Sequence, residues 1–305
     1  MKFGITIPLH RSVEVKTNLE LALRCEELGF DSIWISDHVI LPKKYTSRFS
    51  EILYDPFVLL SSIAAQTKRI KLGTSVLILP YRNPIVVAKM VSTLDMLSDG
   101  RVIFGVGSGW MKEEFDTIGI PFNDRGRRTN EYIKIFKELW NNDEPNFKGE
   151  FYNFSEIKFY PKPLQKPHPP IWIGGNSNKA IRRAIELGDG WHPVWFGPDE
   201  MLEKINLLKK HAIDAGRSLD NFTFSIRNRL RILKKGEKMR DDSTKWRGDL
   251  TFQFYGTTQE IIKYVEQFKN IGVSHIVFDI DVRDDREMFY TLDIFSKEIM
   301  PAFKT

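Results

Sequence analysis

The chain has 305 residues, of which 42% are hydrophobic and 28% are charged, and this composition excludes a disordered chain and a fibrous protein. The net charge of +5 arises from 45 Lys and Arg against 40 Asp and Glu residues. Residues 227–247 alone carry nine basic and three acidic residues, a net charge of +6. Because the positive charge is confined to one segment, we expect no nucleic-acid partner.

Cysteine content and hydropathy indicate a cytoplasmic protein. Cys25 is the only cysteine, which excludes an intrachain disulfide and a multi-cysteine metal site and fits a reducing compartment. The apolar run in residues 1–10 is too short for a signal peptide, and we find no uninterrupted apolar stretch of about 18 residues. For the same reason we expect no membrane partner. The six histidines show no HxH or HExxH spacing, so we expect no bound metal.

Short apolar runs rich in β-branched residues alternate with longer segments along the whole chain. They predict eight strands, over residues 3–7, 32–36, 71–79, 102–106, 171–174, 190–194, 222–229 and 275–280.

The intervening segments have helical periodicity. Val87, Met90, Val91 and Leu94 define one apolar stripe, and residues 132–139 define another. Further helices are predicted over residues 15–28, 55–66, 178–187, 199–215, 258–270 and 285–300. Glycines follow several of these segments at positions where a left-handed residue ends a helix: Gly29, Gly188, Gly216 and Gly272.

Eight strands, each followed by a helix, predict an α/β fold of the (β/α)8 or TIM barrel type, formed by residues 1–305 as a single domain. An open doubly wound sheet is the alternative. Two regions interrupt the alternation. Residues 141–170 are aromatic and proline-rich and predict an ordered excursion with a small hairpin. The basic loop after the seventh strand lies where an anionic ligand would bind in a barrel.

Asp37 and His38 directly follow the second predicted strand. In a barrel this places them at the carboxyl-terminal rim, where a histidine can exchange a proton near neutral pH. The alternative is that His38 only caps the strand. Ser75 and Val76 lie within the third strand run, and by themselves they indicate core packing.

Two glycine-rich stretches follow predicted strands. The stretch from Gly105 to Trp110 has GxGxG spacing without the third glycine of a dinucleotide-binding motif, so it predicts close approach of a ligand or a loop to the backbone. Gly174 and Gly175 precede Asn176, Ser177 and a predicted helix. Free N–H groups there would bind an anion, with Asn176 or Ser177 as N-cap or ligand, although a simple turn and cap is equally compatible.

Arg125, Arg127 and Arg128 open the predicted helix that contains residues 132–139. Positive charge at a helix N-terminus opposes the helix dipole, so this cluster calls for a compensating anion. Glu131 is a candidate partner within the chain, and a solvated cluster is the alternative.

Taken in order, these stretches resemble the luciferase-like monooxygenase superfamily, and within it the branch that uses the deazaflavin coenzyme F420. The resemblance rests on FGITIP at residue 3, FDSIWISDH ending at His38, GTSV at residues 73–76, the run from Asp95 to Phe115, RGRR at residues 125–128, PIWIGGNS at residues 170–177 and GDGWHP at residues 188–193.

The resemblance implies a flavin-like ring at the carboxyl ends of the strands, with Asp37, His38 and Trp110 beside it and His38 as the proton-handling residue. It also implies a cis peptide at Ser75–Val76 under the ring, and backbone N–H groups of Gly174, Gly175 and Asn176 on the cofactor phosphate. The basic loop and the Arg125 cluster would meet the acidic tail of F420, which favours F420 over FMN.

The resemblance implies hydride transfer between F420 and a small organic substrate, in a protein that forms a homodimer. Trp110 stands where sugar-phosphate dehydrogenases of this branch carry a catalytic glutamate. Glu114 is expected to be structural or to contact the residues that bind the ligand. This departure keeps two alternatives open: an FMN-dependent monooxygenase that uses reduced flavin and O2, and a non-catalytic flavin-binding barrel.

Overall fold

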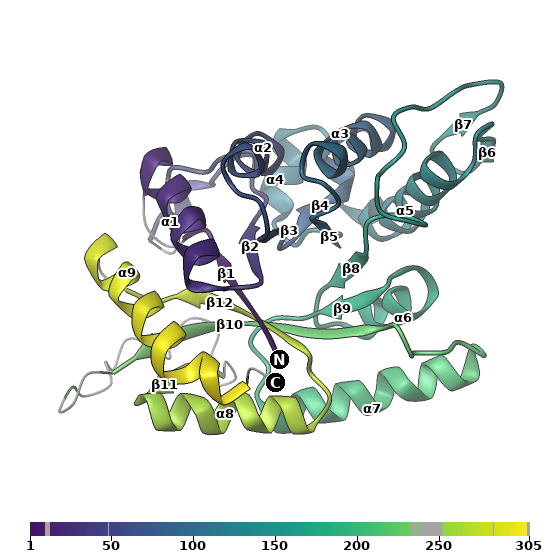
Figure 1. Ribbon diagram of the computed structural model, residues 1–305. Coiled ribbons are helices and arrows are strands. Elements are labelled where there is room, and N and C mark those ends of the chain that lie inside the picture. Colours follow the sequence, from purple (N-terminus) through teal and green to yellow (C-terminus); the bar gives the residue numbers. More distant parts are fainter. Residues whose placement is uncertain (10–12, 48, 234–236, 238–251, 283, 304–305) are drawn as a thin grey trace.

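The computed structural model describes the chain except for residues 10–12, 48, 234–236, 238–251, 283 and 304–305. Eight parallel strands form a closed barrel in the order β1, β2, β3, β5, β8, β9, β10 and β12, and β12 pairs with β1 to close it (Figure 1). The TIM barrel prediction is therefore confirmed. The barrel strands are β1 (Lys2–Thr6), β2 (Ser32–Ile35), β3 (Lys71–Thr74), β5 (Val102–Gly107), β8 (Ile171–Gly174), β9 (Gly190–His192), β10 (Thr223–Ile232) and β12 (His275–Ile280).

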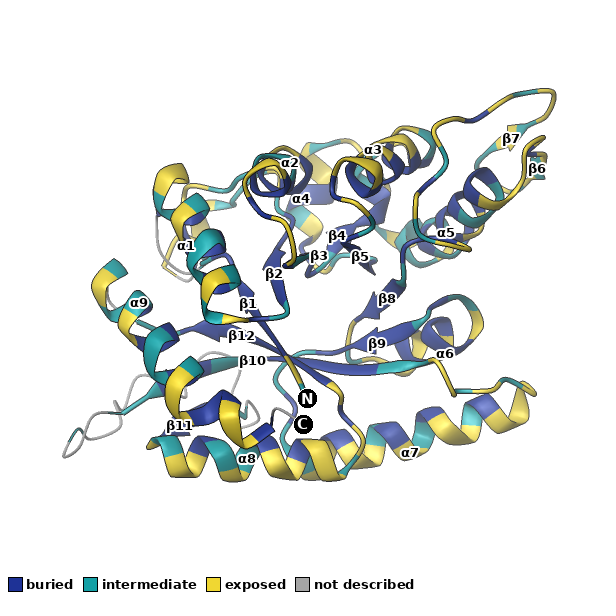
Figure 2. Ribbon diagram, in the orientation of Figure 1, coloured by how far each residue is buried: buried dark blue, intermediate teal, exposed yellow. Residues whose placement is uncertain are grey.

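The strands are buried on both faces, which is why they read as continuous apolar runs in the sequence (Figure 2). Inside the barrel, the rings of Trp34 and Trp172 stack with centroids 5.3 Å apart. Glycine at position 73 makes room for this stack, since a Cβ there would lie 2.1 Å from Cε3 of Trp34. Large aromatic side chains thus fill the barrel and leave its carboxyl-terminal end for the site.

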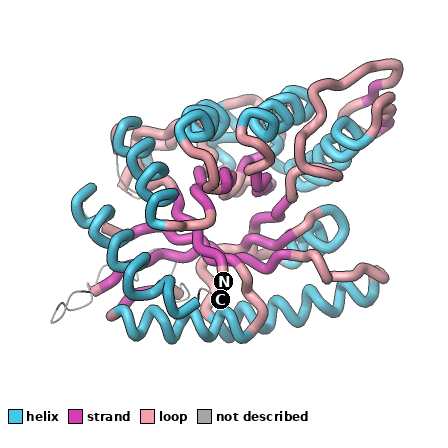
Figure 3. The backbone as a smooth tube through the Cα atoms, in the orientation of Figure 1, coloured by secondary structure: helices cyan, strands magenta, loops and turns pink. Residues whose placement is uncertain are grey.

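Helices surround the barrel and cover its outer face (Figure 3). Predicted and observed bounds coincide for α1, α6 and α8. The helices are α1 (Val15–Leu28), α2 (Pro56–Gln66), α3 (Pro84–Leu97), α4 (Lys112–Thr117), α5 (Arg125–Asn141), α6 (Asn178–Leu187), α7 (Pro198–Asp214), α8 (Thr258–Asn270) and α9 (Asp285–Ile294). Among the residues that the structure describes, no helix is both long and apolar enough to traverse a bilayer.

Polar side chains fix several helix starts. Asp55 accepts hydrogen bonds from the N–H groups of Phe57 and Val58 and so caps α2. Thr257 and Glu260 form a reciprocal capping box at the start of α8. Each cap satisfies N–H groups that have no partner within the helix.

Three of the four predicted C-terminal glycines, Gly29, Gly216 and Gly272, have positive φ angles. The prediction for Gly188 is wrong, because its φ of −99° and ψ of 168° are extended. The chain passes there directly from α6 into the segment that leads to β9. Glycine is required at this position for a different reason, since a Cβ would lie 2.6 Å from Cγ1 of Ile173.

One predicted strand is divided in the structure, and one observed strand was not predicted. The run predicted over residues 71–79 divides into β3 and the short β4 (Leu77–Ile78), and the peptide bond between Ser75 and Val76 is cis. A further strand, β11 (Phe254–Gly256), pairs parallel with the end of β10 and was not predicted. Its three residues are too few to show an apolar periodicity.

The excursion over residues 141–170 is ordered, as predicted. It contains the antiparallel hairpin of β6 (Phe147–Lys148) and β7 (Asn153–Phe154), which projects from the barrel in Figure 1. Buried Glu131 on α5 anchors the hairpin, because its carboxylate accepts hydrogen bonds from the N–H groups of three consecutive residues, 150–152. Glu131 therefore serves the hairpin and is not a partner of the arginine cluster.

Candidate functional site

A pocket of about 290 Å³ lies at the carboxyl-terminal end of the barrel. It is lined by the ends of β2, β5, β8 and β9 and the segments that follow them. All eight site residues selected from the sequence line it: Asp37, His38, Ser75, Val76, Trp110, Gly174, Gly175 and Asn176. The fold therefore brings together residues that are up to 139 positions apart in the chain.

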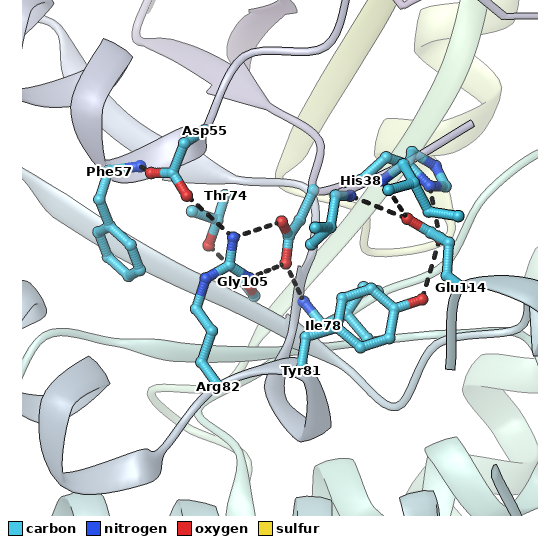
Figure 4. Close-up of polar contacts among 12 residues, drawn as sticks. His38, Asp55, Phe57, Thr74, Ile78, Tyr81, Arg82, Gly105 and Glu114 are labelled. Atoms are coloured by element: carbon cyan, nitrogen blue, oxygen red, sulfur yellow. Dashed lines mark hydrogen bonds and ion pairs between the residues drawn. The ribbon is translucent and has the colours of Figure 1, made fainter. Parts of the chain in front are cut away.

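His38 contacts Glu114 at one wall of the pocket (Figure 4). Nδ1 of His38 lies 2.9 Å from Oε2 of Glu114, on α4. The same carboxylate oxygen accepts a hydrogen bond of 2.9 Å from the hydroxyl of Tyr81, and the other oxygen accepts one of 2.9 Å from the N–H group of Val39. Three segments of the rim thus converge on one carboxylate.

Glu114 is wholly buried, yet its surroundings favour the ionised form. Burial raises the pKa of the carboxyl group, but hydrogen bonds from His38, Val39 and Tyr81 outweigh burial and hold the pKa below its usual range. Burial and the neighbouring carboxylate raise the pKa of Tyr81, so its hydroxyl remains a donor. The ionised carboxylate of Glu114 therefore faces Nδ1 of His38 as a hydrogen-bond acceptor.

Asp37 lines the same wall, but its carboxylate is engaged by protein groups. Arg82 binds it through two hydrogen bonds, of 2.6 and 2.9 Å, and the N–H group of Ile78 donates a third, of 2.9 Å. Burial raises the pKa of Asp37, while the Arg82 guanidinium opposes that shift. Arg82 also donates to Asp55 (Figure 4), so it links Asp37 at the end of β2 to the cap of α2.

The floor of the pocket contains a buried ion pair. Arg227 on β10 donates two hydrogen bonds to Asp279 on β12, of 2.9 and 2.7 Å. The remaining terminal nitrogen of Arg227 donates to the hydroxyl of Ser36 at 2.8 Å and to the carbonyl oxygen of Ser75 at 2.6 Å. The guanidinium thereby connects four strand ends beneath the cis peptide.

His192, at the end of β9, completes the floor. Its ring nitrogens lie 2.8 Å from the hydroxyl of Ser75 and 2.7 Å from that of Ser225. Burial and the charge of Arg227 lower the pKa of His192 to about 3. His192 is therefore neutral at physiological pH.

Glycines allow the cis peptide segment to pack tightly against neighbouring strands. A Cβ at Gly107 or at Gly174 would lie 2.6 Å from a methyl carbon of Val76. A Cβ at Gly105 would lie 1.9 Å from the carbonyl oxygen of Thr74. The glycines in the carboxyl-terminal half of β5 thus permit close backbone approach, as predicted for GxGxG.

The segment before α6 exposes backbone donors to the pocket. Ser177 is the N-cap, since its hydroxyl accepts a hydrogen bond from the N–H group of Ala180. The side chain of Asn176 instead exchanges two hydrogen bonds with the backbone of Val194. Gly175 and Asn176 line the pocket directly before the start of α6, so their backbone N–H groups lie at its edge.

Aromatic rings surround the outer part of the pocket. Trp110 packs edge-on against Tyr45, with ring centroids 5.4 Å apart, and lies 6.5 Å from the ring of His38. The ring centroid of Phe49 lies 5.5 Å from that of His38 and 6.4 Å from that of Trp110. Trp110 retains 43% of its accessible surface, so it is available to an entering ligand.

Within the described residues, carboxylates pair with only one arginine of the cluster. Arg127 forms ion pairs with Asp124 and Glu150. Arg125 donates to the carbonyl oxygens of Gly109 and Phe122, and its guanidinium covers the Phe122 ring at 3.7 Å. Of the three, Arg125 thus contacts a segment that lines the pocket.

The basic segment needs a correction. Its first three arginines lie inside strand β10, where Arg227 pairs with Asp279 and Arg231 with Glu237, so they do not belong to a ligand-binding loop. Both arginines were counted as loop charges because composition does not reveal strand ends or partners. Most of the remaining segment, including residues 238–251, lies outside the described residues. Among those that are described, no cluster of His, Cys, Asp or Glu could hold a metal ion.

Comparison with known proteins identifies the family. The sequence model of the luciferase-like monooxygenase family matches residues 1–275. The chain belongs to this family. A luciferase-like solved structure, that of an F420-dependent secondary alcohol dehydrogenase in complex with an F420–acetone adduct, superposes with a TM-score of 0.83 over 100% of this chain and 99% of that one, at 23% identity.

Two curated relatives of this luciferase-like chain use different cofactors. One is the F420-dependent glucose-6-phosphate dehydrogenase of Amycolatopsis mediterranei, 38% identical over 57% of this chain and 51% of the relative. The other is the FMNH2-dependent dimethylsulfone monooxygenase of Pseudomonas putida, 32% identical over 59% of this chain and 49% of the relative. The matched region spans about half the length of each.

Proposed function

We propose that this protein is an oxidoreductase that transfers a hydride between coenzyme F420 and a small organic substrate. One observation carries the proposal: His38, tied through Nδ1 to buried Glu114, lines a mostly apolar pocket at the carboxyl ends of the barrel strands. Barrel enzymes place their chemistry at this end. The matched F420-dependent dehydrogenase supports the choice of cofactor.

The pocket offers a donor set that fits the cofactor. The backbone N–H groups of Gly175 and Asn176, just before the start of α6, would hold the phosphate, together with Gly174. Ser75, Val76, Asp37 and Trp110 would border the ring. Arg125, which contacts the carbonyl oxygen of Gly109, would contribute positive charge toward the acidic tail.

Coenzyme F420, when bound, supplies a carbon atom that takes up or releases a hydride. His38 is the catalytic residue for the matching proton. When an alcohol loses the hydride from its carbinol carbon, Nε2 of His38 takes the hydroxyl proton and the carbonyl bond forms. In the reverse direction the same nitrogen returns the proton to the carbonyl oxygen. Neutral His192 is unsuited to this role because its pKa is about 3.

An FMN-dependent monooxygenase that uses reduced flavin and O2 is the second candidate. Trp110 favours it, because this aromatic ring stands at the position that the resemblance assigns to the glutamate of sugar-phosphate dehydrogenases. The relative that is FMNH2-dependent also favours it. A non-catalytic flavin-binding barrel is the third candidate, which bound cofactor without turnover would support.

Titration of the purified protein with F420 and with FMN, each followed by fluorescence, tests the proposal. We expect F420 to bind in the micromolar range and more tightly than FMN. Micromolar binding of FMN without binding of F420 would replace the first candidate by the second.

We also propose that the chain forms one domain and assembles as a homodimer in the cytoplasm. Exposed apolar side chains on α2 and α3, among them Val58, Val86 and Leu97, would form the contact. The single cysteine, Cys25, is buried and free, as expected in a reducing compartment. Light scattering coupled to gel filtration would detect the dimer, and a monomer would refute it.

A further inference from the structure

Glu114 lines the pocket and contacts Nδ1 of the one histidine to which the proposed function assigns proton transfer. We propose that Glu114 is a positioning residue that fixes the tautomer of His38, with the proton on Nδ1 and the lone pair on Nε2. This inference rests on the proposed function for its catalytic meaning, but the tautomer itself is a property of the protein without cofactor.

The hydrogen-bond pattern around Glu114 dictates that tautomer. Oε1 accepts from the N–H groups of Val39 and Ile40, at 2.9 and 3.4 Å, so these donors orient the carboxylate. Oε2 accepts from the Tyr81 hydroxyl and faces Nδ1 of His38, each at 2.9 Å. A carboxylate that already accepts from three donors has only acceptor capacity to offer, so Nδ1 must carry a hydrogen.

Once Nδ1 is committed to Glu114, Nε2 is the nitrogen left for chemistry. The isolated histidine side chain favours the opposite neutral tautomer, so a surrounding group has to impose this one. A base whose lone pair is already aimed at the substrate needs no rearrangement in the reaction. The buried carboxylate thereby prepares His38 to accept a proton at Nε2.

Glu114 also joins three segments of the rim. It lies on α4, after β5, and it binds the backbone that follows β2 and the Tyr81 side chain that follows β4. Packing restricts the His38 ring further, with Phe49 at 5.5 Å and Trp110 at 6.5 Å. Removal of the carboxylate would change the protonation pattern of His38 while these ring contacts remain.

The substitution Glu114→Gln should invert the tautomer. The backbone N–H groups of Val39 and Ile40 would keep the amide oxygen in the place of Oε1. The amide NH2 group would then face Nδ1 of His38 as a donor, and the hydrogen of the neutral ring would move to Nε2. The substitution is isosteric, so the volume of the site does not change.

Nitrogen NMR of protein labelled with ¹⁵N-histidine measures this directly at about pH 9, well above the ordinary histidine pKa of about 6.5. The His38→Asn variant assigns the resonance. We expect the Nδ1–H form in the wild type and the Nε2–H form in Glu114→Gln. Glu113→Gln is the matched control, since Glu113 is adjacent, exposed and paired with Lys44, and it should leave the spectrum of His38 unchanged.

A wild-type protein whose His38 carries its proton on Nε2 would overturn the proposal, even if Glu114→Gln failed to fold. An unchanged tautomer in a folded Glu114→Gln variant would overturn it too. Tyr81→Phe is a milder second variant that removes one hydrogen bond to Glu114. It should keep the Nδ1–H form and lower the rate by about tenfold or less.

Kinetics of the F420-loaded enzyme then connect the tautomer to catalysis. We expect Glu114→Gln to lower the hydride-transfer rate about 10²-fold or more, within the range for general acid–base catalysis, with unchanged F420 affinity. An unchanged rate with an inverted tautomer would refute the catalytic meaning. Failure to bind any cofactor would refute the proposed function instead, while the NMR result would still decide the role of Glu114.

Discussion

Two histidines border the same pocket, and their surroundings differ. His38, on the wall, faces the ionised carboxylate of Glu114, while His192, on the floor, lies between two serine hydroxyls above the Arg227–Asp279 ion pair. Burial and Arg227 disfavour the charged form of His192, whereas His38 contacts an ionised carboxylate. The comparison indicates that position at the carboxyl-terminal rim is not sufficient for proton transfer, because neighbouring charges decide which histidine can perform it.

The largest expected effect on stability comes from removing the ion pair between Arg227 and Asp279 at the floor of the pocket. Asp279→Asn would leave Arg227 buried without a carboxylate, which should lower the free energy of unfolding by about 3–5 kcal/mol. Urea denaturation measures the loss. Asp116→Asn, at an exposed ion pair with Lys112, is the control and should have little effect. Equal losses in the free energy of unfolding for the two variants would mean that the Arg227–Asp279 ion pair does not stabilise the protein.

Acidification tests the neutral state of His192. The pKa of His192 is about 3 in the folded state and about 6.5 in the unfolded state. Protonation of the unfolded state therefore lowers the free energy of unfolding as the pH falls from about 6.5 toward 3, and has little effect above pH 6.5. Between pH 7 and 5 His192 should contribute a loss of about 2 kcal/mol, and His275, with a pKa also lowered by burial to about 3, a similar loss.

The measurement is urea denaturation at the two pH values for the wild type and for His192→Gln. The variant cannot take up a proton at this position, so its stability should fall less steeply with pH. A wild type and a variant with the same pH dependence would show that His192 does not remain neutral in the folded protein.

A smaller effect on stability tests how tightly Val76 packs against β5. Gly107→Ala would place a methyl group 2.6 Å from Cγ2 of Val76 and should cost about 1–3 kcal/mol. Gly126→Ala, in the first turn of α5 with its nearest contact at 3.5 Å, should instead stabilise the protein by about 0.4–1 kcal/mol, because alanine restricts the unfolded chain. Thermal unfolding of the pair checks the signs, and a stabilised Gly107→Ala would contradict the tight packing of Val76.

Much of the fold follows from local sequence patterns. Buried parallel strands read as apolar runs and amphipathic helices as stripes, so the eight strands, the barrel and the helices α1, α6 and α8 were predictable. The pocket residues were predictable as well, because in a barrel every strand end lies at the same rim. The structure brings these residues together from distant segments, and their roles stay predictions.

The contacts that give these residues their chemistry were not predictable in the same way. Arg227 was counted with the basic segment, and its partner Asp279 is 52 residues further on. One signal was present, since an aspartate inside the apolar strand HIVFDI requires a buried partner. Glu114 and His38 are 76 positions apart, and only the fold shows that α4 turns the carboxylate toward the end of β2. Side-chain pairing depends on register and rotamer, which periodicity does not encode.

Single-turnover reduction of bound F420 by a panel of small alcohols, followed by the loss of its absorbance, tests the central claim most directly. We expect at least one alcohol to bleach the cofactor, and His38→Asn to slow that reaction about 10²- to 10⁴-fold while F420 affinity is retained. Bleaching at the wild-type rate in His38→Asn, with F420 bound as tightly as in the wild type, would contradict the account.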